Sequence, residues 1–120
     1  MNHDRFRRLV LRALADIPEP FATHLRGVAV VVRREPNADD RVEAGLESDD
    51  ELFGLYTGTP LTERHDYQMT LPDRIVIFQG PHEREFARAA LSRQIRLTVM
   101  HEVAHHFGID DARLEQLGLE

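Results

Sequence analysis

The sequence predicts an α+β fold in which helices near both ends of the chain enclose a small sheet. Apolar residues recur at helical spacing near the N-terminus and again near the C-terminus, and three short apolar runs, two of them rich in β-branched residues, lie between them. The chain has 120 residues, which is enough for one hydrophobic core but too few for a separate substrate domain. We therefore expect a single domain over residues 1–120.

Composition narrows the classes of partner and of metal site. The chain carries 15 basic and 21 acidic residues, a net charge of −6, and no basic tract, which argues against a nucleic-acid partner and against an acidic membrane surface. It has no cysteine, so a metal ion would need His, Asp, Glu or water as ligands. Residues 1–17 lack the apolar region of a signal peptide, and no run is long enough to span a membrane. We expect a cytoplasmic protein.

The first predicted helix covers residues 3–17 and ends before Pro18 and Pro20. Arginines occupy one side of it, and the other side carries an apolar stripe made of Phe6, Leu9, Val10, Ala13, Leu14 and Ile17. Such a stripe could bind a partner or a membrane surface, but packing on the core of the same chain is its commoner use.

The best predicted strand is residues 27–33. This run does not alternate with polar residues, which implies burial on both faces of the sheet. Residues 21–26 before it are expected to form a short turn. Residues 34–51 after it are polar and acidic and predict an exposed loop. The acidic cluster of that loop could bind a cation, but it lacks the spacing of an EF-hand, and a solvated loop is the simpler interpretation.

Two further strands are predicted at residues 52–57 and 74–79, the second closed by a glycine-proline pair. Gly54 interrupts the first, which is typical of a bulge or of a close backbone approach. The loop between them, residues 61–72, is dense in reactive side chains that could overhang a site, although loops are commonly polar.

Helices are then predicted at residues 83–90 and 92–107, with Ser92 as the N-cap of the second. The apolar face of the second helix comprises Leu97, Val99, Met100, Val103, Ala104 and Phe107. Its polar edge comprises Gln94, Thr98, His101 and His105. Gly108 stands where a helix C-cap glycine is expected, and a short closing helix is predicted at residues 111–117.

The chemistry is concentrated at residues 101–111, which read HExxHxxGxxD. A step of four residues places His101 and His105 about 40° apart around the helix and about 6 Å apart along it, so both imidazoles can reach one ion. Glu102 lies about 100° from His101, where its carboxylate can reach a water molecule on that ion. A random order of this composition gives about 0.04 HExxH matches, and about 0.0002 once the glycine and the aspartate are also required.

At these residues the chain resembles the zincin metallopeptidases, and more closely the small minimal-zincin, or zincin-like, metallopeptidase family. The resemblance rests on residues 101–118 and extends more loosely to several segments between residues 52 and 81. It implies a small α+β fold with a three- to four-stranded mixed sheet packed against the N-terminal helix and the HExxH helix.

The resemblance also implies a ligand set of His101, His105 and Asp111, with about one zinc ion per chain. Asp110 is the competing third ligand, and it would otherwise cap the closing helix. His106 points about 100° away from His105 around the helix, so we expect it to form a hydrogen bond rather than to share the ion.

The resulting hypothesis is zinc-dependent hydrolysis of a peptide or other amide bond, with Glu102 as the general base. His65 and Tyr67 are candidates for steadying the developing oxyanion. An extended peptide or protein substrate could align with the strand at residues 52–57. The alternative is a metal-binding domain that binds a partner without general protease activity, because 120 residues leave no second subdomain to wall a cleft. Monomeric and oligomeric states are both open.

Overall fold

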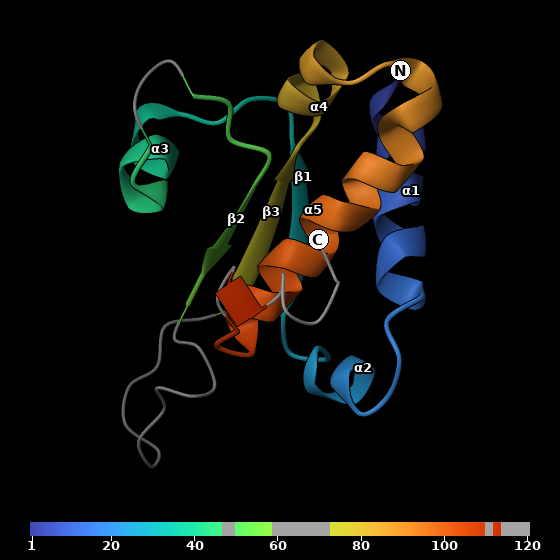
Figure 1. Ribbon diagram of the computed structural model, residues 1–120, viewed down its shortest axis with the longest axis vertical. Coiled ribbons are helices and arrows are strands. Elements are labelled where there is room, and N and C mark those ends of the chain that lie inside the picture. Colours follow the sequence, from blue (N-terminus) through green and yellow to red (C-terminus); the bar gives the residue numbers. More distant parts are fainter. Residues whose placement is uncertain (47–49, 59–72, 110–111, 114–120) are drawn as a thin grey trace.

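The computed structural model describes residues 1–46, 50–58, 73–109 and 112–113. Its elements follow one another as α1 (His3–Ala15), α2 (Phe21–His24), β1 (Ala29–Arg33), α3 (Ala38–Ala44), β2 (Gly54–Thr57), β3 (Arg74–Phe78), α4 (Gln79–Glu85), the 3-10 helix η2 (Arg88–Ala90) and α5 (Leu91–His106) (Figure 1). None of these helices is both long and apolar enough to cross a membrane. The predicted closing helix at residues 111–117 lies almost wholly outside the described residues.

The three strands form one mixed sheet in the order β1-β3-β2. β3 is central and pairs in parallel with β1 and antiparallel with β2. The predicted α+β fold with a three- to four-stranded mixed sheet is therefore confirmed. The expected burial of the strand at residues 27–33 on both faces is wrong: β1 is an edge strand, and none of its residues is buried. The strand buried on both faces is β3, because Ile75 and Ile77 belong to the apolar cluster on one face and Val76 and Phe78 to the cluster on the other.

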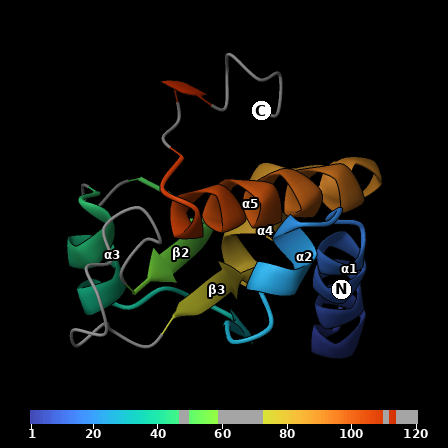
Figure 2. The ribbon, with the colours of Figure 1, turned by 90° about the horizontal axis from the view of Figure 1, so that it is seen from below.

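Two helices, α1 and α5, cover one face of the sheet (Figure 2). The core beneath them consists of Phe6, Val10, Ala13, Ile17, Ile75, Ile77, Leu91, Ile95, Val99 and Val103. The apolar stripe of α1 thus packs on its own core, as expected. Asn2 caps this helix by accepting a hydrogen bond of 2.8 Å from the backbone N–H of Arg5.

A smaller apolar cluster occupies the opposite face of the sheet, where Leu52 and Leu55 pack with Val76 and Phe78. Part of this cluster is covered by α3, which lies beside β2 (Figures 1 and 2). The prediction of an exposed loop over residues 34–51 is wrong in this part. Asn37 and Asp40 form a capping box at the start of α3, and Gly45, with φ 72°, ends it.

The start of α5 also differs from the prediction. Ser92 is not its N-cap: the helix begins at Leu91, directly after the 3-10 turn, and Ala90 occupies the cap position without a side-chain hydrogen bond. The helix expected at residues 83–90 is divided between α4 and η2. The glycine-proline pair expected to close β3 lies in the first turn of α4, where proline is tolerated because its missing N–H would have no helical partner.

Candidate metal site

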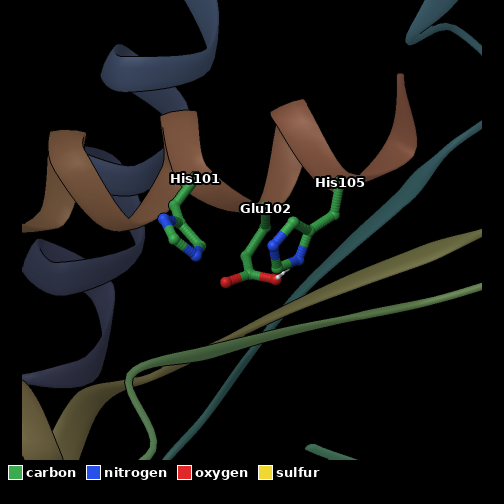
Figure 3. Close-up of side chains that lie close together, drawn as sticks. All are labelled: His101, Glu102 and His105. Carbon is green, nitrogen blue, oxygen red and sulfur yellow. Dashed lines mark ion pairs between the residues drawn. The ribbon is translucent and has the colours of Figure 1, made fainter. Parts of the chain in front are cut away.

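Three potential ligands project from the same side of α5. A donor atom from each of His101, Glu102 and His105 can be chosen so that all lie within 4.8 Å of one another. The two imidazole rings have their centroids 4.7 Å apart. Figure 3 shows the Glu102 carboxylate between the two rings in this view. The helical spacing read from the sequence therefore brings these side chains together as expected.

Glu102 lies at the floor of the site, whereas the histidines face outward. Its side chain is 7% exposed, and its Oε1 lies 3.3 Å from Nδ1 of His105, whose side chain is 39% exposed. A carboxylate in such a position is screened from bulk water but can still meet a molecule that enters from the open side.

Gly54 is what allows Glu102 to lie so close to the sheet. A Cβ atom at this position would lie 2.9 Å from Cγ2 of Thr98, 3.0 Å from Cγ of Glu102 and 3.3 Å from its Oε2. Of the two interpretations of this glycine, the close approach of another element is confirmed: α5 passes directly over β2 at this point.

The donor set fits a zinc ion. Zinc binds imidazole nitrogen at about 2.0–2.1 Å in tetrahedral geometry, so two such donors lie about 3.4 Å apart. The imidazole nitrogens of His101 and His105 are close enough to approach that spacing by small rotations about side-chain bonds. Asp110 and Asp111, the two candidates for a further ligand, lie outside the described residues, as do His65 and Tyr67.

The end of α5 is a Schellman turn. The N–H of Gly108 (φ 74°) donates to the carbonyl of His105 at 3.0 Å, and the N–H of Ile109 donates to the carbonyl of Ala104 at 2.9 Å. The predicted glycine C-cap is therefore confirmed. It reverses the chain immediately after the two metal-ligand candidates.

His106 faces the interior rather than the metal-ligand candidates. Its side chain is buried, its ring packs edge-on against Tyr56 and Phe107, and its Nδ1 lies 3.8 Å from Oδ1 of Asp73. The hydroxyl of Tyr56 donates to the same carboxylate oxygen at 2.8 Å. His106 is absent from the group of potential ligands found in the described part of the chain. Its 3.8 Å separation from Asp73 is longer than a hydrogen bond, so the hydrogen bond expected for His106 stays a prediction.

A second buried histidine, which the sequence did not single out, supports α5 from behind. Nδ1 of His82 lies 2.6 Å from the carbonyl oxygen of Phe78, and its Nε2 lies 2.8 Å from the hydroxyl of Thr98. The carbonyl can only accept, so Nδ1 carries a proton and donates to it, whereas the hydroxyl of Thr98 that meets Nε2 also donates to the carbonyl of Gln94 at 3.0 Å. Burial lowers the pKa of His82 below its usual value of 6.5, partly offset by the hydrogen bond to Phe78.

A groove of about 560 Å³ opens in front of the histidines. Its lining comes from the end of α3, the segment leading into β2, β2 itself and α5: Glu43, Ala44, Leu46, Glu51, Leu52, Phe53, Gly54, Leu55, Tyr56, Leu97, Thr98, His101, Glu102 and His105. Leu97, expected on the apolar face that packs on the sheet, lines this groove instead. Reasoning from sequence also missed Glu43, and the signal that could have found it is the capping box that starts α3.

A family model described as zincin-like metallopeptidase matches residues 25–119 of the chain. This chain belongs to the zincin-like metallopeptidase family. The match includes β1, the groove and the whole of the HExxH helix of this zincin-like protein. The family implies a bound metal ion, and the cluster on α5 is a possible place for it.

Among solved structures, the zincin-like chain is similar to a conserved hypothetical protein from Thermus thermophilus. The two share 22% sequence identity with a TM-score of 0.57, over 98% of this chain and 97% of the other. At that identity the likeness supports the fold alone. No curated protein matches the chain.

Proposed function

We propose that this protein is a zinc-dependent hydrolase of peptide or other amide bonds. The observation that carries the proposal is the position of Glu102, which lies within the same cluster as His101 and His105 and faces a groove beside an edge strand. A metal site that served structure alone would gain nothing from a buried carboxylate beside its ligands and an open groove in front of them.

The residues have distinct roles in this proposal. His101 and His105 would hold the ion, together with Asp111 as the proposed third ligand. A bound zinc ion supplies a Lewis acid and a water molecule acidified to a pKa near 7. Glu102 accepts the proton of the attacking water and passes it to the leaving nitrogen, so that the amine departs neutral. His65 and Tyr67 remain our candidates for stabilising the oxyanion.

The proposed substrate is a peptide or protein segment in extended form. Among the strands of the described residues, β2 lies at an edge of the sheet with β3 as its one partner, and the groove follows it. An extended segment can add to such an edge through main-chain hydrogen bonds, which hold the scissile bond beside α5 independently of side-chain identity. The negative net charge gives no support to a nucleic-acid or acidic-membrane substrate.

A metal-binding domain without general protease activity is the second candidate function. The size of the groove, about 560 Å³, favours it, because such a volume encloses only a short segment of a protein substrate. In this case the same edge strand and groove would bind a partner protein without hydrolysing it.

The test compares wild type with Glu102→Gln, both loaded with zinc, on a broad peptide library. We expect wild type to cleave part of the library and Glu102→Gln to lose that activity by about 100-fold or more while binding the same amount of zinc. The metal content of each sample is the control. Equal cleavage by both proteins, or none by wild type, would exclude the hydrolase in favour of the binding domain.

A further inference from the structure

We propose that the groove selects segments that carry a basic side chain, lysine or arginine, and that Glu43 is the carboxylate that recognises it. This inference rests on the proposed function, because it names the substrate class of the same site.

The charged side chains along the groove are all acidic. They are Glu43, Glu51 and Glu102, and no lysine or arginine is among the lining residues of the described chain. The two histidines of the lining are metal-ligand candidates and would be neutral when bound to an ion. Outside the metal site, the charges that the described residues present to a segment in the groove are therefore negative.

Two of the three carboxylates are already engaged by other groups. Glu102 belongs to the metal cluster. Glu51 forms hydrogen bonds of 2.9 and 3.0 Å with the guanidinium of Arg84, which also binds Glu35 through two hydrogen bonds of 2.8 Å. Glu43 is exposed, and no ion pair joins it to another of the described residues. Of these three carboxylates, that of Glu43 is therefore the one available to bind a cationic side chain of the substrate.

Glu43 is held in place by the way α3 is fastened to the sheet. Asp40, buried at the start of α3, binds the guanidinium of Arg33 at the end of β1 through hydrogen bonds of 2.9 and 3.0 Å. Arg41 donates a hydrogen bond to the backbone carbonyl of Asp50, in the segment that leads into β2. The helix is thus tied to β1 and to the segment that leads into β2, so Glu43 projects from an anchored helix of the groove wall.

The end of α3 adds an apolar surface beside this carboxylate. The left-handed Gly45 turns the chain so that the N–H of Leu46 donates to the carbonyl of Arg41 at 3.0 Å, and Leu46 then packs on the cluster of Leu52 and Leu55. Leucines next to a carboxylate suit a side chain with an aliphatic stem and a cationic end, since the stem covers the apolar wall while the charge reaches the carboxylate. Aspartate or glutamate would be repelled there.

Binding of three short synthetic peptides tests the proposal. They have the same length and the same neutral sequence, with arginine, glutamine or glutamate at the central position, and they are titrated into zinc-loaded Glu102→Gln protein. We expect the arginine peptide to bind about fivefold tighter than the glutamine peptide, with the preference shrinking as salt is added. Adding Glu43→Gln should abolish the preference, and Glu43→Lys should transfer it to the glutamate peptide.

Glu85→Gln is the matched control, because it removes the same charge from an exposed helical position that does not line the groove. It should retain the preference for arginine. Equal affinities for the arginine and glutamine peptides, binding of none of the three, or a preference that survives Glu43→Gln would each overturn the proposal. A preference for arginine without cleavage by wild type would overturn the hydrolase instead and leave the selectivity standing.

Discussion

The position of Glu102 depends on a single missing side chain. Gly54 carries no Cβ where one would press on both Thr98 and Glu102. Its backbone is not among the glycines with positive φ, so an alanine could adopt the same conformation. Any cost of a larger residue therefore comes from the contact with α5 and not from backbone strain.

Gly54→Ala is expected to lower the free energy of unfolding by about 1 to 3 kcal/mol, because the added methyl group forces β2 and α5 apart. Gly27→Ala is its control: a Cβ at Gly27 meets nothing within 4 Å, so this change should be neutral or slightly stabilising. Urea unfolding of both variants measures the difference. If both variants matched wild type, the close approach of α5 to β2 would be incorrect.

The contact between α4 and α5 depends on a buried histidine whose pKa is lowered in the folded chain. His82 lies among the rings of Phe6, Phe53 and Phe86, and it links the carbonyl of Phe78 to the hydroxyl of Thr98. Its pKa is lowered by burial. The pKa of His82 is 6.5 in the unfolded chain and lower in the folded chain. At a pH between these two values, the unfolded chain binds a proton at His82 that the folded chain does not bind.

The contribution of His82 to stability is thus complete above pH 6.5 and is lost as the pH falls from 6.5 toward its folded pKa. We expect the free energy of unfolding of the metal-free protein to fall as the pH is lowered from about 6.5, by at most about 1.4 kcal/mol per pH unit for this group. His82→Gln should remove that part of the slope, although it lowers stability at every pH. A slope unchanged by the substitution would show that His82 is protonated in the folded state or exposed.

A bound ion would couple the metal site to the stability of the whole domain. His101 and His105 lie on α5, which also supplies Ile95, Val99 and Val103 to the main core. An ion that binds only the folded chain stabilises it by RT ln(1 + [L]/Kd), which is about 4 kcal/mol at a free concentration of about 1,000 Kd.

Zinc is accordingly expected to raise the melting temperature, and a chelator to lower it to the value of the metal-free chain. Calorimetry with and without zinc measures the shift. The double variant His101→Ala/His105→Ala should melt at the same temperature in both conditions. A zinc-dependent shift in that variant would place the ion elsewhere on the molecule.

The metal cluster and its helix could be predicted from the sequence because they depend on local spacing. Residues four apart share a helix face in any fold, and a glycine after the last turn caps a helix whatever surrounds it. The same holds for α1 and for the approximate position of each strand. The capping box of α3 is equally local, but the acidic composition around Asn37 and Asp40 concealed it.

Only the tertiary structure decided the order of the strands and the residues that lie opposite the metal-ligand candidates of α5. Two runs of β-branched residues have the same local preference, and only the path of the chain decides that β3 lies in the middle and β1 at an edge. Gly54 and Glu43 are distant from the HExxH motif in sequence, so no periodicity could place one beneath Glu102 and the other on the groove wall. The motif identifies a candidate metal site, whereas the packing of β2 against α5 places Gly54 beneath Glu102, and α3 adds Glu43 to the wall of the groove.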